Sequence, residues 1–268
     1  MASFSIVSNI ASVNAQANLQ STSIGLNKAL TRLSSGLRIN NSGDDAAGLA
    51  VANQYRSDIA ILNQGVRNAN DGLSTLQTKD GALNNISTLL DRLATLATQA
   101  SSTSNGVDVG KLSDEYGTII EEIDRQAAVA SLNAASDFSV FVSSETTVAD
   151  GVISGSIGAA DTATLGLAST SFTSATEAQD ALAEVTAAID ALGDVQNTVG
   201  TLQNRLTFAI GLAQSQIVNT KAAESRIRDA NIAEESANMT RFNILSQSGI
   251  AALAQANQTS ASVLALLR

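Results

Sequence analysis

The sequence predicts a mainly α-helical protein, with long antiparallel helices, a terminal coiled coil and a small β-hairpin element at the outer tip. Apolar residues recur at spacings of three and four along most of the chain, which is typical of amphipathic helices. The chain contains no proline, so nothing of that kind interrupts a long helix. Only residues 138–173 alternate apolar with polar residues between glycines, which indicates short strands and turns.

Both ends of the chain carry amphipathic patterns that favour burial against another surface. Little else in the chain is available to cover them, and isolated helices are marginal in water. We therefore expect these helices to pack on each other and on neighbouring copies of the chain. The predicted subunit-interface residues are Ile6, Ile10, Val13, Leu30, Leu33, Ile250, Leu253, Val263, Leu264 and Leu267.

The central elements follow in order. A heptad series from Leu83 to Ala97 predicts a long helix, and a second series begins at Leu182 and continues to Ala213. Ser174 and Glu177 match a capping box that opens this second helix. Between them, DFSVFVS, VISGSIG and TATLGLA are expected to form short strands and turns. This order predicts that the N-terminal and C-terminal halves pair antiparallel.

Composition excludes several classes of function. The chain has neither histidine nor cysteine, so the common hydrolase triads cannot form. The net charge of −10 argues against nucleic-acid binding, which requires clustered lysine and arginine. No 18-residue apolar run and no secretory signal peptide are present, so these tests alone predict a cytosolic protein. We expect no catalytic, cofactor-binding or metal-binding residues.

The stretch SGDDAAG, which begins at Ser42, raises two alternatives. An acidic pair in a glycine-rich turn could belong to a metal-dependent active site, but a two-metal site needs more converging carboxylates. The other interpretation is a joint between two helices. Gly36 would end the first helix in the left-handed conformation, and Ser42 would cap the next. Asp44 and Asp45 would then lie in its first turn, near the positive end of the helix dipole.

At this stretch the chain resembles bacterial flagellin. The matching motifs, in chain order, are LSSGLRINNSGDDAAGLAVAN at 33–53, GALNNISTLLDRLATLATQAS at 81–101, EEIDR at 121–125, LQNRL at 202–206, AAESRIRDANIAEESANM at 222–239, and ILSQSGIAALAQANQ with VLALLR at 244–268. The resemblance implies a structural subunit that polymerises into the flagellar filament used for swimming. The alternative is a hook–filament junction protein with the same terminal helices, and a monomeric helical enzyme using the acidic pair is a third hypothesis.

The resemblance also implies an organisation and a set of partners. Residues 1–42 and 228–268 would form an inner coiled-coil domain, 43–137 and 174–227 an outer-core helical domain, and 138–173 a reduced variable region. The subunit would be exported to the extracellular filament by the type III flagellar apparatus, without a cleaved signal peptide. Partners would be other copies, an export chaperone, and the filament cap and hook-associated proteins, with no nucleic acid and no membrane insertion.

Two surface regions follow from the same resemblance. Arg92, Leu96 and Glu115 align with the patch of other flagellins that a host innate immune receptor recognises; the alternative is that this face packs on a neighbouring protofilament. The exposed, serine- and threonine-rich variable region would carry O-linked sugars. The candidate acceptors are Ser143, Ser144, Thr146, Thr147, Ser154, Ser156, Thr162, Thr164, Ser169 and Thr170.

Overall fold

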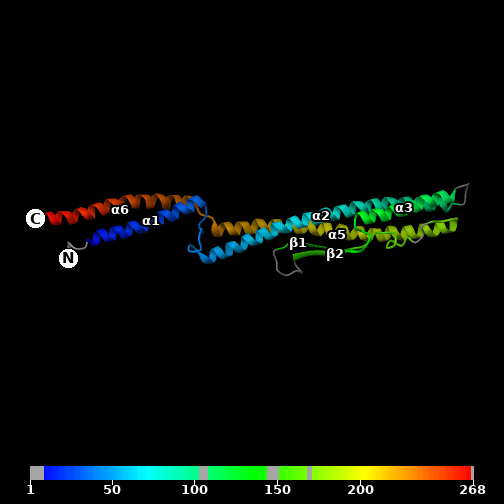
Figure 1. Ribbon diagram of the computed structural model, residues 1–268, viewed down its shortest axis with the longest axis horizontal. Coiled ribbons are helices and arrows are strands. Elements are labelled where there is room, and N and C mark those ends of the chain that lie inside the picture. The colour runs from blue at the N-terminus through cyan, green and yellow to red at the C-terminus, as the bar shows by residue number, and fades with distance from the viewer. Residues whose placement is uncertain (1–8, 103–107, 144–150, 168–170, 267–268) are drawn as a thin grey trace. The chain divides into compact units, whose positions relative to one another are not determined.

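The computed structural model describes residues 9–102, 108–143, 151–167 and 171–266, and its side chains as far as residue 258. The predicted fold class is confirmed. The elements in order are α1 (Ile10–Ser35), α2 (Ala46–Ala100), α3 (Val109–Val129), β1 (Ser136–Phe141), β2 (Val152–Ile157), α5 (Ala175–Arg228) and α6 (Ile232–Leu266), as Figure 1 shows. The chain divides into a terminal unit, residues 1–57 and 220–268, and a central unit, residues 58–219.

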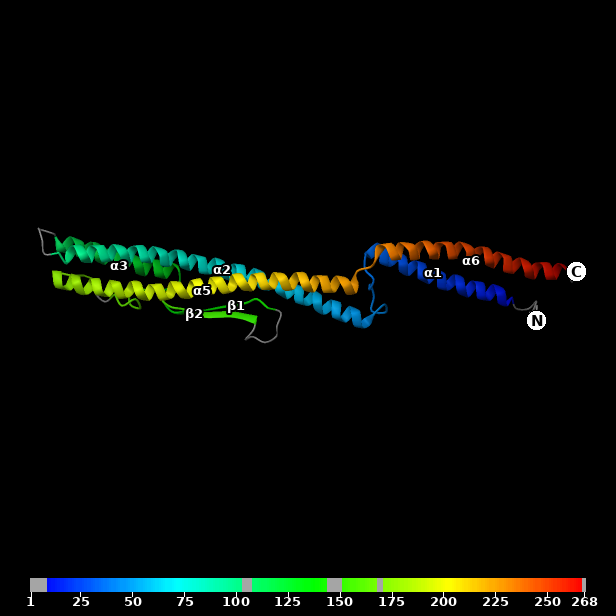
Figure 2. The ribbon, with the colours of Figure 1, turned by 180° about the vertical axis from the view of Figure 1, so that it is seen from behind.

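In the terminal unit, α1 and α6 pack side by side and antiparallel (Figures 1 and 2). The pairing keeps one register along the helices. Near the chain ends, Asn9 Nδ2 donates to the carbonyl of Ala256 at 2.8 Å. Towards the other end, Arg32 Nη1 lies 3.0 Å from Glu235 Oε1. These two contacts define the register of the antiparallel pair.

Two glycines set how closely these helices approach. A Cβ on Gly25 of α1 would lie 2.6 Å from Phe242 Cζ of α6. In the reverse direction, a Cβ on Gly249 of α6 would lie 2.9 Å from Leu19 Cδ1 of α1. Such distances are too short for real carbon atoms, so each helix provides a glycine hollow that the other fills with a large side chain. The helices interlock reciprocally at these two positions.

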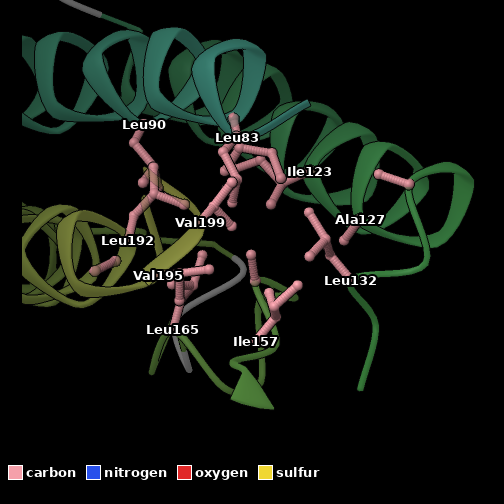
Figure 3. Packing of buried hydrophobic residues seen from close by; sticks show 14 of the residues in the cluster. Leu83, Leu90, Ile123, Ala127, Leu132, Ile157, Leu165, Leu192, Val195 and Val199 are labelled. Atoms are coloured by element: carbon pink, nitrogen blue, oxygen red, sulfur yellow. The ribbon is translucent and has the colours of Figure 1, made fainter. Parts of the chain in front are cut away.

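The core of the central unit lies between α2, α3 and α5. Figure 3 shows side chains from the three helices converging, with Leu83 and Leu90 from α2, Ile123 from α3 and Val199 from α5 among them. These four residues are fully buried, as their heptad-like spacing predicts. Leu, Ile, Val and Ala fill most of this core, and its two aromatic residues, Tyr116 and Phe172, meet edge to face with ring centroids 5.2 Å apart.

The small sheet is an antiparallel hairpin that pairs Ser136 with Ile157 and Phe141 with Val152 at its two ends. It lies along the side of α2 and α5 (Figure 1), so the expectation that it stands at the outer tip is not met: the apolar residues of β1 pack against the middle of the helices. The hairpin packs closely on both helices. A Cβ on Gly65 or Gly72 of α2 would touch Val142 or Val140, and a Cβ on Gly155 of β2 would touch Leu202 of α5. The two helices therefore bury the apolar face of β1, which carries Phe138 and Val140.

The segment after β2 agrees with the expectation of short strands and turns. DFSVFVS and VISGSIG contain the two strands, and residues 162–166 of TATLGLA form a turn. The turn is held to α3 because Thr162 donates from its backbone nitrogen and its hydroxyl to Asp124 Oδ1, at 2.9 and 2.8 Å. Leu165 and Leu167 are buried in the core. Residues 158–167 therefore form a packed return segment, where an inserted sequence would disturb the core.

The observed grouping into two units differs from the three-part division expected from the resemblance. Residues 43–57 and 220–227 group with the terminal unit, and the hairpin groups with the central unit. The helices α2 and α5 continue through these positions without a break, so local pattern offers no boundary there. The inner, outer-core and variable regions stay a prediction.

Candidate functional site: the helix joint and the terminal helix pair

The joint consists of two chain segments that are bound to each other, one between α1 and α2 and the other between α5 and α6. Gly36 ends α1 with φ 71, the left-handed conformation that glycine adopts at little cost. Its carbonyl accepts from the backbone nitrogen of Ala230 at 2.9 Å. Arg38 donates from its backbone nitrogen to the carbonyl of Arg228, and Leu37 forms a bridge with Asp229. These bonds fix the place where the helix pair begins.

Asp45, and not Ser42, caps α2. Asp45 Oδ1 accepts from the backbone nitrogen of Gly48 at 2.8 Å, and the helix begins at the next residue, Ala46. The prediction that Ser42 is the cap is wrong, because Ser42 lies in the turn four residues before the helix. The prediction that both acids lie in the first helical turn is also wrong. Gly48 leaves room for the cap, since a Cβ there would lie 2.5 Å from Asp45 Oδ2.

Asp44 holds the turn that precedes the cap. Its Oδ2 accepts from the backbone nitrogens of Asn40 and Asn41, each at 3.3 Å, and its Oδ1 lies 2.8 Å from Lys28 Nζ. The hydrogen bond from Lys28 and then those from the backbone lower the pKa of Asp44 to about 2. Within the described part of the chain, no group of three or more acidic, histidine or cysteine side chains could hold a metal ion. The acidic pair is accounted for by helix geometry.

We expect Asp45→Ala to lower the free energy of unfolding by about 1 kcal/mol, the usual cost of removing an N-cap. Ser42→Ala is the matched control and is expected to change it by less than about 0.5 kcal/mol, as for a surface site without such a role. Urea denaturation followed by circular dichroism measures both. Equal effects of the two substitutions would contradict the assignment of Asp45 as the cap.

The low pKa of Asp44 predicts a dependence of stability on pH. A carboxyl group whose pKa falls on folding stabilises the folded state above its unfolded pKa, near 4. This contribution is lost as the pH decreases through the folded pKa of about 2. We expect wild type to be more stable than Asp44→Asn at pH 6, and the difference to vanish as the pH approaches 2. A difference that stays constant over this range would show that the carboxylate charge contributes nothing.

Sequence reasoning missed two features on the C-terminal side of the joint. Asn231 caps α6, because its Oδ1 accepts from the backbone nitrogen of Ala233 at 3.2 Å. The pattern Asn231-x-x-Glu234 is that of a capping box, so it could have predicted this N-cap. The second feature is the pairing of Arg32 with Glu235, whose side chains are only 23% and 11% exposed. No local pattern indicates that pair, since the residues are far apart in the sequence.

Most of the predicted terminal interface residues that the structure describes are uncovered. Ile10, Val13, Leu30 and Ile250 are each at least half exposed, and Leu33 and Leu253 are half-buried. Ile6 and Leu267 lie outside the described residues, as do the side chains of Val263 and Leu264. The structure adds exposed aliphatic residues that the prediction did not include: Ile24, Ile232, Ile244 and Leu245. The packing of α1 on α6 therefore leaves many aliphatic side chains of the pair exposed.

The predicted receptor patch is not formed as expected. Leu96 is 1% exposed and belongs to the core of the central unit, so it cannot be a surface anchor. Leu96 belongs to the same buried cluster as Tyr116 and Ile120 of α3 and Val185 of α5. Arg92 and Glu115 remain on the surface and form an ion pair, with Arg92 Nε 3.0 Å from Glu115 Oε1. Only this charged pair is available to a partner.

The candidate sugar acceptors separate into three groups. Ser154, Ser156 and Thr164 are exposed, and Ser143 is half-buried. Thr162 is buried and its hydroxyl is bonded to Asp124, so the prediction that it is an acceptor is wrong. Five candidates lie outside the described residues: Ser144, Thr146, Thr147, Ser169 and Thr170.

Across the helices that the structure describes, none is long and apolar enough to span a membrane.

The fold and the joint define a class: a helical structural protein whose terminal helices expose aliphatic side chains. Comparisons with known proteins give the family. Residues 6–138 match the model of the bacterial flagellin N-terminal helical region, and residues 182–267 match that of the C-terminal helical region. The chain belongs to the bacterial flagellin family.

Individual relatives agree with this assignment. The chain is 38% identical to a flagellin of Halalkalibacterium halodurans and 33% identical to a flagellin of Bacillus subtilis. It is 34% identical to the flagellar filament 33 kDa core protein of Treponema phagedenis. Each alignment covers 97% of this chain and 98% of the relative. The crystal structure of Bacillus cereus flagellin matches with a TM-score of 0.48 at 29% identity, covering 59% of this chain and 94% of that one.

The protein is therefore a structural subunit that polymerises into the bacterial flagellar filament, as the resemblance predicted. The alternative of a hook–filament junction protein is not favoured, because these relatives are flagellins over nearly their whole length.

Proposed function

We propose that the terminal unit is the main contact between subunits in the filament, and that its exposed aliphatic residues become buried there. The observation that carries this proposal is the imbalance in α1 and α6. Among the described residues of α1, only Ala29 is buried, whereas Ile10, Val13 and Ile24 are each at least 60% exposed. On α6, Ile244 is 61% exposed. Apolar surface of this extent on a helix pair is typical of an interaction site.

The exposed residues form continuous features of the helix pair. One face of α6 is lined by Ala237, Ile244 and Leu245 beside Arg241. Next to it, a groove between α1 and α6 contains Leu19, Phe242 and Leu245. A neighbouring subunit that buries one such aliphatic side chain gains about 1.5–3 kcal/mol. The joint supports this contact by holding α1 and α6 in one register.

The test is polymerisation of Ile244→Ser. Loss of one buried aliphatic side chain is expected to raise the critical concentration for filament formation about tenfold or more, since 1.4 kcal/mol corresponds to a factor of ten. Sedimentation of filaments at a series of protein concentrations gives this quantity. Val129→Ser is the control, because Val129 is 74% exposed but lies in the central unit. Assembly of Ile244→Ser at the wild-type concentration would refute the proposal.

We further propose a set of partners that follow from family membership. They are the flagellar export apparatus and an export chaperone, the filament cap, and the hook-associated proteins. We propose a structural role without enzymatic activity. In agreement with this, Asp45 is engaged as a helix cap and Asp44 in an ion pair with Lys28.

A host immune receptor would contact the exposed Arg92–Glu115 pair, and Leu96 would take no part because it is buried. Ser154 and Ser156 on β2 are the described strand residues best placed to carry sugars, and intact-mass measurement of native filaments tests this.

A further inference from the structure

Lys79 occupies a position of α2 where an apolar residue is expected. Positions 72, 79, 86, 93 and 100 follow at intervals of seven, and all five residues are buried. Four of them are Gly72, Ile86, Leu93 and Ala100, whereas the fifth is Lys79, which is only 7% exposed. No other lysine or arginine is buried among the residues that the structure describes. A single polar residue in such a series lowers stability, and its best-attested role is to specify how the elements pair.

The ammonium group of Lys79 is held by oxygens of the connection between α3 and β1. Its Nζ donates to the carbonyl oxygen of Ser131 at 2.8 Å and lies 3.5 Å from the hydroxyl of Ser136. None of the ion pairs between described side chains involves Lys79. Burial lowers the pKa of Lys79, because it removes water from the ammonium group. An apolar side chain at this position would avoid that cost, so stability alone does not account for the lysine.

The carbonyl that Lys79 binds belongs to a strained residue at the end of α3. The backbone nitrogen of Ser131 donates to the carbonyl of Ala128 at 3.1 Å. That of Leu132 donates to the carbonyl of Ala127 at 2.7 Å, which completes a Schellman motif. The motif places Ser131 in the left-handed conformation, with φ 54, where glycine is usual. Within the described part of the chain, no other non-glycine residue has a positive φ. Lys79 therefore supports a backbone conformation that serine by itself disfavours.

We propose that Lys79 specifies where the hairpin sits on α2, by fixing the end of α3 and the start of β1 at one point of that helix. Four residues separate Ser131 from Ser136, so holding both of them determines where β1 begins. A shift of β1 by one residue would turn Phe138 and Val140 away from the helices. In such a placement the ammonium group would also be buried without its acceptor, which is costly. Apolar contacts alone do not discriminate in this way, because they are not directional.

Lys79→Met tests the proposal, because it removes the ammonium group and keeps an unbranched side chain that suits a core. Hydrogen exchange measured by mass spectrometry on the full-length monomer is expected to become about tenfold or more faster in β1 and β2. The melting temperature and the exchange of α2 are expected to stay unchanged or improve. Lys111→Met is the control, since the Lys111 side chain is 83% exposed, and it is expected to change none of these. Unchanged exchange of the hairpin overturns the proposal.

A rescue experiment separates this role from a general contribution to stability. If Lys79→Met lowers the melting temperature and speeds exchange in α2 and the hairpin alike, Lys79 only stabilises the fold and the proposal is wrong. Ser131→Gly added to Lys79→Met is expected to restore part of the hairpin protection, because glycine adopts the left-handed conformation without support. In the wild-type background, Ser131→Gly is expected to leave the exchange of the hairpin unchanged. Absence of any rescue would show that Lys79 does not act through the end of α3, which also overturns the proposal.

Discussion

Gly65→Ala is expected to lower the free energy of unfolding of the protein by about 2–3 kcal/mol, the upper part of the range for overpacking a tight site. A Cβ at position 65 would lie 2.3 Å from the carbonyl oxygen of Val142 and 2.7 Å from its carbonyl carbon. These atoms belong to the backbone, so no change of rotamer relieves the clash. The backbone nitrogen of Val142 also donates to Gly151 at 2.9 Å, which ties this point to the other side of the hairpin.

Gly81→Ala is the control for this prediction, since it makes the same change in the same helix. A Cβ on Gly81 would meet no described heavy atom within 4 Å. Alanine is a better helix former than glycine by up to about 1 kcal/mol, so this variant is expected to be as stable as wild type or more stable. Thermal unfolding followed by circular dichroism compares the two. If Gly65→Ala were as stable as Gly81→Ala, the hairpin would not be seated on α2 as closely as described.

The second large effect is expected from Gly25→Leu, which fills the hollow on α1 that Phe242 occupies. Even a Cβ would lie 2.6 Å from the ring of Phe242, and a leucine side chain extends further. The two helices must then separate or change register. If this costs about 1–3 kcal/mol, the critical concentration for filament formation rises by roughly five- to 150-fold. Sedimentation of filaments measures the change.

A double variant shows whether the effect comes from this contact. Phe242→Ala alone leaves a hollow and is expected to weaken assembly as well. In Gly25→Leu with Phe242→Ala, the leucine occupies space that the ring has left, so the combined effect is expected to be smaller than the sum of the two. Strict additivity would mean that the two positions do not meet in the filament, and the register assigned to α1 and α6 would be wrong.

Local sequence determined the helices and the end of α1 at the joint. The spacing from Leu83 to Ala97 predicts a buried helix face because side chains three and four residues apart point the same way. The left-handed conformation of Gly36 follows from the same kind of reasoning, since glycine lacks the Cβ that penalises it. The alternation of Phe138 and Val140 was likewise sufficient to predict a strand. Each of these features depends on residues within one or two turns of each other.

Only the tertiary structure showed which residues that were expected at the surface are buried, and which residue caps α2. Leu96 was expected on the surface, but it belongs to the core that α2 shares with α3 and α5. Thr162 resembles a loop residue in the sequence but is buried by its bonds to Asp124, 38 positions away. Ser42 and Asp45 can both cap a helix, and in the structure Asp45 is the cap while Asp44 is paired with Lys28. Burial was settled by contacts between distant segments, which periodicity and composition do not encode, and the sequence offered two residues for one cap.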